Sequence, residues 1–218
     1  MKIKICGVSR EEDIEYVNEA RPDYTGFVFA ESRRKVTPTQ AAKLRRRLAE
    51  GIAAVGVFVD APIDGIASLC RDGIISLVQL HGAEDDAYIA RLKEVSRGIQ
   101  VIKAIKSAEL LSHATHATLA EAGKAITTGA DYFLIDSGAG SGKTFDWDLL
   151  RAGTPCASWL QSSGKRWFLA GGITPENIEQ AMELNPFAID VSGGVETNGI
   201  KDRNKIVQLT AMVRKETV

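Results

Sequence analysis

Two side chains that could transfer protons stand at the ends of short apolar segments. Cys6 is the last residue of the segment 2–6, and Asp136 directly follows the segment 132–135. A thiol and a carboxylate on different strands of one barrel can serve as base and acid on a single small substrate. A buried structural cysteine and a loop-ordering carboxylate are the alternative interpretations of these two residues.

The alternation of side chains along the first segment favours an inward-pointing Cys6. In a strand, Lys2, Lys4 and Cys6 share one face, and Ile3 and Ile5 share the other. If the isoleucines face the surrounding helices, Cys6 points into the mouth of a barrel. A nearby cation would then help its thiol to reach the thiolate state.

The same alternation predicts a buried ion pair. Lys4 and Asp190 should both point inward from the first and last strands, which are neighbours in a closed barrel. We expect the pair to lie just below Cys6, where the cationic end of Lys4 helps to orient or acidify the site.

Glycine pairs follow the last two apolar segments. Gly171 and Gly172 follow the segment 167–170. Ser192, Gly193 and Gly194 follow the chain's last apolar segment, 187–191. Glycine lets the backbone approach a ligand closely. Many barrel enzymes bind phosphate in the loops after strands 7 and 8, so these glycines predict a phosphate site. Tight turns without a ligand are the alternative.

Arg34 lies in a basic loop with Arg33 and Lys35, after the segment 24–29. An arginine fork matches a carboxylate with two hydrogen bonds, so Arg34 is a candidate anion clamp. A solvated basic loop is the alternative.

The residues 137–144 resemble a P-loop, but Ser137 stands where the first glycine should be. We therefore expect an active-site loop beside Asp136 there.

Gln79 lies near the end of the fourth apolar segment and His81 directly follows it, at the same predicted edge as Cys6 and Asp136. His81 has no second histidine or carboxylate at the spacing of metal ligands, so no metal site is expected. The other two histidines, His113 and His116, lie in a helical stretch that spans 107–129 and are expected at the surface.

Strand-like and helix-like stretches alternate along the whole chain. The expected strands are 2–6, 24–29, 53–59, 77–80, 101–105, 132–135, 167–170 and 187–191. Such alternation is typical of parallel strands joined by helices, and eight units in 218 residues fit a (β/α)8 barrel. A single catalytic domain over 1–218 is expected, with a doubly wound open sheet as the alternative. Helix starts are expected at Thr37-Pro38, Thr174-Pro175 and Asp202.

Composition narrows the classes of function. Lys plus Arg number 27 and Asp plus Glu number 28, so the net charge of −1 offers no basic footprint for nucleic acid. The longest apolar stretches, about nine residues, are too short to span a bilayer, and no signal-peptide pattern opens the chain. Three cysteines make no disulfide framework, so a reducing, cytoplasmic location is expected, with Cys70 and Cys156 as bystanders.

Taken in order, these strand ends resemble the phosphoribosylanthranilate isomerase family, nearly end to end. The matching segments are Lys4-Ile5-Cys6-Gly7, Gly26-Phe27-Val28-Phe29, Ser32-Arg33-Arg34, Val55-Gly56-Val57-Phe58-Val59, Gln79-Leu80-His81-Gly82, Asp136, Gly140-Ser141-Gly142-Lys143-Thr144-Phe145-Asp146-Trp147, Leu169-Ala170-Gly171-Gly172, Asp190-Val191-Ser192, Gly194-Val195-Glu196 and Gly199-Ile200-Lys201-Asp202.

The resemblance implies an Amadori rearrangement of N-(5-phosphoribosyl)anthranilate in tryptophan biosynthesis, without cofactor or metal. It implies that Asp136 is the general acid that protonates the furanose ring oxygen. Cys6 is then the general base that takes the proton from the sugar C2, and Arg34 holds the anthranilate carboxylate. The resemblance, with the position at the strand ends, gives this set of substrate-binding residues: Arg34, Gln79, His81, Gly171, Gly172, Asp190, Ser192, Gly193 and Gly194.

One position departs from the family pattern. The family usually has Ser-Ser-Gly where this chain has Ser192-Gly193-Gly194. If backbone N–H groups hold the phosphate, the change costs little. If the missing hydroxyl contributes, phosphate affinity should fall modestly.

Three points stay open from the sequence. Another phosphosugar isomerase or epimerase barrel is one alternative, although the paired aspartates of histidine-pathway isomerases and the metal ligands of epimerases are not seen. A non-catalytic phosphate-ligand barrel is another, and the presence of both Cys6 and Asp136 argues against it. The expected partner is the small phosphosugar substrate alone, with no nucleic acid or membrane, for a chain that is a monomer or a homodimer.

Overall fold

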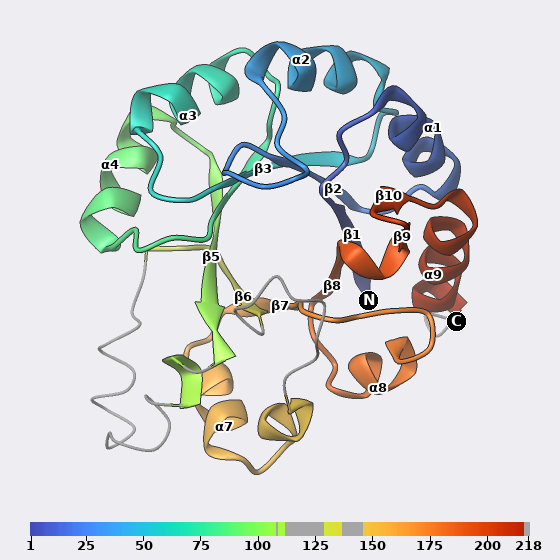
Figure 1. Ribbon diagram of the computed structural model, residues 1–218. Coiled ribbons are helices and arrows are strands. Elements are labelled where there is room, and N and C mark those ends of the chain that lie inside the picture. The colour runs from blue at the N-terminus through green and yellow to red at the C-terminus, as the bar shows by residue number, and fades with distance from the viewer. Residues whose placement is uncertain (108, 112–128, 137–145, 216–218) are drawn as a thin grey trace.

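Eight parallel strands close into one barrel in chain order, and helices surround it (Figure 1). The structure is a computed structural model that describes residues 1–107, 109–111, 129–136 and 146–215. The closed sheet confirms the (β/α)8 barrel and excludes the open sheet. The strands are β1 Lys2–Cys6, β2 Tyr24–Val28, β3 Ala53–Phe58, β4 Leu77–Leu80, β5 Gln100–Lys106, β6 Tyr132–Asp136, β7 Arg166–Leu169 and β8 Ala188–Val191.

The helices follow the strands and form the outer layer of the barrel. They are α1 Glu11–Ala20, α2 Pro38–Arg47, α3 Ile63–Arg71, α4 Asp86–Val95, α7 Pro155–Ser162, α8 Ile178–Glu183 and α9 Arg203–Lys215, with the 3-10 turns η1 Trp147–Leu150 and η2 Gly193–Val195. A two-stranded antiparallel hairpin, β9 Glu196–Thr197 and β10 Ile200–Lys201, stands between η2 and α9. The expected loop 137–144, and the part of the expected helical stretch that holds His113 and His116, lie outside the described residues.

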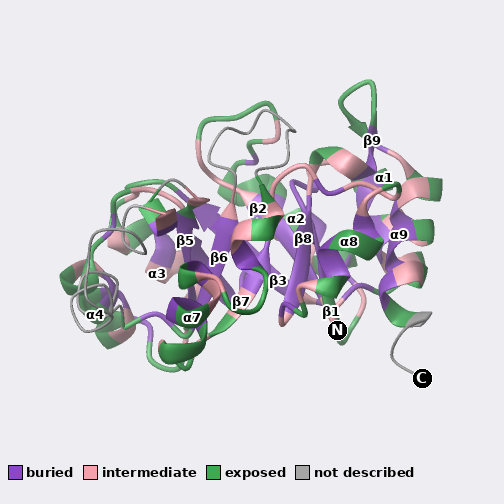
Figure 2. Cartoon of the chain, turned by 90° about the horizontal axis from the view of Figure 1, so that it is seen from below, coloured by how far each residue is buried: buried purple, intermediate pink, exposed green. Residues whose placement is uncertain are grey.

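Two apolar clusters build the molecule, one on each side of the sheet. Ile3 and Ile5 are fully buried in the large cluster between the barrel and its helices. Tyr24, Leu134 and Phe168 belong to a second cluster that fills the barrel interior. Because neighbouring residues of a strand point to opposite sides, this arrangement confirms that the side chains of Lys4 and Cys6 face inward. Figure 2 shows the buried residues running along the strands, with exposed residues on the outer faces of the helices.

Capping side chains explain most of the helix starts. The Thr37 hydroxyl accepts a hydrogen bond from the Gln40 backbone N–H at 3.2 Å, as expected for a threonine followed by proline. Oδ1 of Asp202 accepts from the backbone N–H groups of Asn204 and Lys205 at 2.9 and 3.2 Å, so Asp202 caps α9.

The helix start expected at Thr174-Pro175 is wrong. The α8 helix begins at Ile178. Thr174 lies in a turn before it, and the Thr174 hydroxyl accepts a hydrogen bond from the Glu176 backbone N–H at 3.3 Å. The Asn177 side chain is the reason. Its Oδ1 accepts from Thr174 N–H at 2.8 Å and its Nδ2 donates to the Gly172 carbonyl at 2.9 Å, so these residues form a folded loop before the helix.

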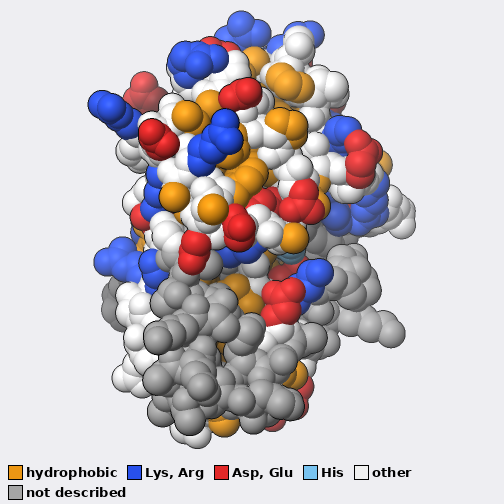
Figure 3. Space-filling view, turned by 90° about the vertical axis from the view of Figure 1, so that its left-hand side faces the viewer, with side chains coloured by type: hydrophobic (Ala, Val, Ile, Leu, Met, Phe, Trp, Pro, Cys, Tyr) orange, Lys and Arg blue, Asp and Glu red, His pale blue; other side chains and the backbone are white. Residues whose placement is uncertain are grey.

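The outer surface carries both signs of charge. On the face that α3 and α4 form, acidic and basic side chains lie side by side with scattered apolar ones (Figure 3). This mixture agrees with the nearly neutral total charge. Within the described ranges, no helix has the length and apolar character needed to cross a membrane.

Candidate active site

A cavity of about 480 Å³ opens at the carboxyl ends of the barrel strands. Its volume lies within the range of small-molecule sites. The expected site residues all line it: Cys6, Arg34, Gln79, His81, Asp136, Gly171, Gly172, Asp190, Ser192, Gly193 and Gly194. The topology therefore brings together residues that are up to 188 positions apart in the chain.

Cys6 lies at the carboxyl end of β1, where the residue is 8% exposed. Gly26 is its partner on β2, and a Cβ atom at position 26 would lie 2.8 Å from the Cys6 Sγ. The missing side chain of Gly26 therefore makes the space for the thiol. Burial raises the pKa of Cys6 above its usual value, although the charge of Lys4 acts in the opposite direction.

Lys4 and Asp190 form the predicted ion pair inside the barrel. The two residues are register partners on β1 and β8, and Lys4 Nζ lies 2.9 Å from Asp190 Oδ2. Burial by itself lowers the pKa of Lys4, but the Asp190 carboxylate and the Cys6 thiol outweigh it, so the pKa lies above its usual value. Lys4 therefore stays charged beside Cys6. It offsets part of the effect of burial on the thiol but does not reverse it.

A row of hydrogen bonds leads from Lys4 across the barrel to Asp136. Lys4 Nζ donates to Gln79 Oε1 at 2.8 Å, and Gln79 Nε2 lies 3.0 Å from His81 Nδ1. His81 Nε2 lies 3.2 Å from Asp136 Oδ2. Gln79 therefore contacts Lys4, and His81 contacts Asp136. Both line the cavity as parts of one polar row.

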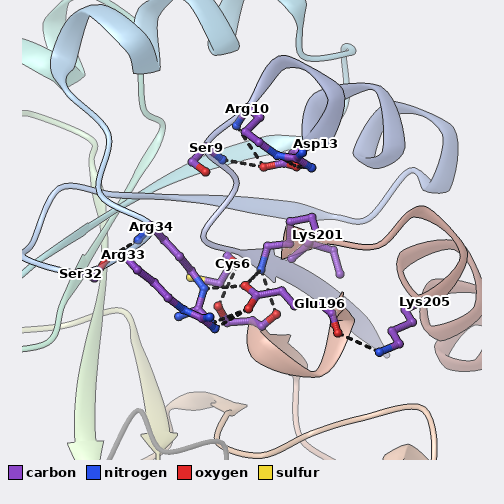
Figure 4. A network of polar contacts seen from close by, with 12 residues as sticks. Cys6, Ser9, Arg10, Asp13, Ser32, Arg33, Arg34, Glu196, Lys201 and Lys205 are labelled. Carbon is purple, nitrogen blue, oxygen red and sulfur yellow. Dashed lines mark hydrogen bonds and ion pairs between the residues drawn. The ribbon is translucent and has the colours of Figure 1, made fainter. Parts of the chain in front are cut away.

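Arg34 reaches over the cavity mouth and contacts Glu196, a residue for which no role was predicted (Figure 4). Arg34 Nε and Nη2 lie 2.6 and 2.9 Å from the two carboxylate oxygens of Glu196. Arg33 Nη2 and Lys201 Nζ contact the same carboxylate at 2.5 and 2.9 Å. Burial raises the pKa of Glu196, but Arg34 and Lys201 outweigh it and hold the pKa below its usual value. Glu196 stood within a matched segment, yet nothing in the sequence pointed to its partners.

The two glycine loops pack against each other at the cavity rim. Gly171 and Gly172 have φ angles of 90° and 67°, which side-chain-bearing residues rarely adopt. A Cβ atom on Gly194 would lie 1.8 Å from the Ile173 carbonyl oxygen, so the loops touch through their backbones. Among the described residues, no hydrogen bond uses the N–H groups of Gly171 and Gly172. These groups remain available to an anion.

The arrangement joins a candidate acid and a candidate base to candidate anion-binding groups in one cavity. Cys6 and Asp136 lie on β1 and β6, the glycine loops follow β7 and β8, and Arg34 comes from the loop after β2. In the part of the chain that is described, no three His, Cys, Asp or Glu side chains gather to hold a metal ion. The site suits proton transfer on a small ligand that carries anionic groups.

Comparison with known proteins gives one consistent result. A family model described as "N-(5'phosphoribosyl)anthranilate (PRA) isomerase" matches residues 3–211. A relative from Endomicrobium trichonymphae, named N-(5'-phosphoribosyl)anthranilate isomerase, is 44% identical over 98% of both chains. The crystal structure of phosphoribosyl anthranilate isomerase from Thermus thermophilus superposes with a TM-score of 0.80 at 32% identity, covering 99% of this chain and 100% of that one. A further structure of such an isomerase, solved with reduced 1-(o-carboxyphenylamino)-1-deoxyribulose 5-phosphate, gives a TM-score of 0.76 at 28% identity, with 99% of each chain covered.

Proposed function

The chain belongs to the N-(5'-phosphoribosyl)anthranilate isomerase family of tryptophan biosynthesis, and from this premise we propose how its cavity performs the aldose–ketose isomerisation. The observation that carries the proposal is the presence of Cys6 and Asp136 in one cavity with three candidate anion-binding elements. An acid and a base on different strands can reach different atoms of one sugar.

Asp136 acts first, as the general acid. It gives its proton to the furanose ring oxygen, the bond between C1 and this oxygen breaks, and the nitrogen electron pair forms an open-chain iminium. His81 contacts Oδ2 of Asp136, so it can stabilise the carboxylate that remains.

Cys6 then acts as the general base. Its thiolate takes the proton from C2, and the C–H electron pair neutralises the iminium to give an enolamine. The enolamine tautomerises to the aminoketose, with proton transfer from the C2 hydroxyl to C1. Water then takes the proton that Cys6 has gained and returns one to Asp136, which restores both groups. The cation of Lys4 and the transient positive charge of the iminium both favour the thiolate, against the burial that raises the pKa of Cys6.

Two anion sites hold the ends of the substrate. The backbone N–H groups of Gly171 and Gly172, with the loop of Ser192, Gly193 and Gly194, bind the phosphate. Arg34 binds the anthranilate carboxylate with its Nη1 side, because Nε and Nη2 already contact Glu196.

A thiol in the role of base favours the cytoplasm as the location of the reaction. Cys6, Cys70 and Cys156 are all unpaired, and a base at Cys6 must stay reduced. The cytoplasm is the compartment that meets this requirement.

Two conservative substitutions test the assignment. In a fluorescence assay of phosphoribosylanthranilate consumption, Cys6→Ser and Asp136→Asn should each lower kcat by about 10²–10⁴-fold. Circular dichroism should show an unchanged fold. Cys70→Ser is the matched control and should keep wild-type kcat. Asp136→Asn with wild-type kcat would remove the role of the acid, and a wild-type protein without turnover would leave only phosphate-ligand binding.

A further inference from the structure

The row from Lys4 to Asp136 fixes which atoms carry protons. A lysine ammonium has only donor hydrogens, so the Gln79 atom 2.8 Å from Lys4 Nζ must be the amide oxygen. The Gln79 NH2 group then faces His81 Nδ1 at 3.0 Å. Because an NH2 group donates, Nδ1 must be an acceptor without a proton.

The burial of the row makes this orientation hard to reverse. The side chains of Lys4 and Gln79 are 0% and 2% exposed, so water cannot replace either partner. Lys4 is also held by Asp190, its register partner on the neighbouring strand. Turning the Gln79 amide would place its NH2 group against an ammonium and leave two buried donors facing each other.

A neutral imidazole with a bare Nδ1 carries its proton on Nε2. Nε2 is the atom that lies 3.2 Å from Asp136 Oδ2. We propose that Lys4 and Gln79 are positioning residues that hold His81 as the Nε2–H tautomer, so that His81 donates its hydrogen bond to the general acid. The inference rests on the proposed role of Asp136.

The donated bond has a chemical consequence. When Asp136 gives the proton of its other oxygen to the substrate, negative charge develops on the carboxylate, and the hydrogen bond to Oδ2 becomes charge-assisted. An interaction that strengthens as the proton leaves lowers the barrier to ring opening. The opposite tautomer would present a bare Nε2 to Asp136 and would instead accept the acid's proton.

The row also links the two halves of the reaction. Lys4 contacts Gln79 at the start of the row, and its charge lies beside Cys6. One buried cation therefore supports the base directly and the acid through two neutral side chains.

Nitrogen NMR tests the tautomer without any assay of activity. In protein labelled with 15N-histidine, at a pH where the ring is neutral, His81 should show a protonated Nε2 and a bare Nδ1. The signals of His81 are identified among those of the three histidines by their loss in His81→Gln. A protonated Nδ1 in the wild-type protein would overturn the inference, whatever the outcome for Asp136→Asn.

Gln79→Glu tests whether Gln79 sets the tautomer of His81. A carboxylate at position 79 accepts from both Lys4 and His81, so the proton should move to Nδ1, and Nε2 should stop donating. We expect kcat to fall roughly tenfold or more, with KM changed by less than about threefold, because the lost bond stabilises the transition state and not the bound substrate. Gln100→Glu is the matched control, the same change at an exposed residue of β5, and should preserve the tautomer and kcat.

Each remaining outcome decides between the two proposals. If Gln79→Glu moves the proton but leaves kcat unchanged, the link to catalysis is wrong. If it fails to move the proton, Gln79 does not set the tautomer. Gln79→Met replaces Gln79→Glu if the latter does not fold; it removes the donor, and both tautomers should then appear. If the wild-type protein shows the Nε2–H tautomer but no turnover, the proposed function fails and the tautomer assignment stands.

Discussion

Arg34 and Glu196 form a two-pronged ion pair across the cavity mouth, with Nε 2.6 Å from Oε1 and Nη2 2.9 Å from Oε2. The pair joins the loop after β2 to the segment after β8. Arg34 is therefore not a free clamp that waits for an anion. Its guanidinium is already oriented by a carboxylate of its own chain, and this preorganisation would lower the entropy lost on binding the proposed substrate carboxylate.

Replacing Arg34 tests this orientation. Arg34→Lys cannot make the fork to Glu196 and offers no planar edge to a carboxylate. We expect KM for phosphoribosylanthranilate to rise by about tenfold to a hundredfold, with a smaller change in kcat, in steady-state kinetics. Arg33→Lys is the control, because the Arg33 side chain is 57% exposed and contacts one oxygen of Glu196, Oε2. Equal KM values for both variants would contradict the role of Arg34.

Glu196 should matter for stability as well. The Glu196 and Lys201 side chains are 4% and 2% exposed and lie 2.9 Å apart, so Glu196→Gln leaves Lys201 with an uncompensated buried charge. We expect the free energy of unfolding in urea to fall by about 3 kcal/mol. Glu31→Gln, which removes the exposed partner of Lys35, should change it by less than about 0.5 kcal/mol. A loss of similar size in the two variants would refute the buried pair.

Cys6 gives the stability a dependence on pH. Burial raises the pKa of the thiol above 9.0, so the folded protein keeps a proton that the unfolded chain loses. The contribution to stability is full below about pH 9 and declines as the pH rises through that value, by up to about 1.4 kcal/mol per pH unit. Urea unfolding between pH 8 and 10 should show a steeper loss for the wild type than for Cys6→Ser. Parallel curves would mean that the native thiol titrates like an exposed one.

Gly26 should control the space around Cys6, the proposed base. Gly26→Ala places a Cβ 2.8 Å from the Cys6 Sγ, closer than van der Waals contact allows. The thiol must move, and we expect kcat to fall by roughly tenfold or more, since small displacements of reacting groups are costly. Gly65→Ala is a matched control in α3, where a new Cβ meets no atom within 4 Å. That variant should keep wild-type kcat and gain up to about 1 kcal/mol of stability.

The two glycines after Ser192 should respond differently to the same change. On Gly194 a Cβ would collide with the Ile173 carbonyl at 1.8 Å and force the two glycine loops apart. On Gly193 it would meet only Arg34 Nη2 at 3.6 Å, an ordinary contact. Titration with inorganic phosphate should therefore show an affinity loss of about tenfold or more for Gly194→Ala and little change for Gly193→Ala. The reverse order would show that the loops bind phosphate in another way.

Much of the fold could be predicted from local patterns. Short apolar segments between helical stretches predicted all eight barrel strands, with ends that differ from the structure by at most one residue. Alternation along β1 and β8 was enough to predict the pair of Lys4 and Asp190. These features depend on neighbouring residues or on the fixed order of strands in a barrel, and such information is present in the linear sequence.

Other features needed the tertiary structure. The start of α8 moved to Ile178 because the Asn177 side chain bonds backward to Gly172. The ion pair of Arg34 with Glu196 joins residues 162 positions apart, and neither residue type predicts the other. Contacts of this kind depend on how loops from distant strands meet.

The sequence by itself determined a barrel of eight parallel strands and the edge at which its chemistry gathers. It did so because strand periodicity and glycine placement are local properties of the chain. Only the tertiary structure decided how those residues are tuned: which edge of Arg34 is occupied, how deeply Cys6 is buried, and how Lys4 and Gln79 orient His81 toward Asp136. The physical reason is that protonation and hydrogen-bond direction depend on burial and on atoms within a few ångströms, and closure of the barrel brings those atoms together.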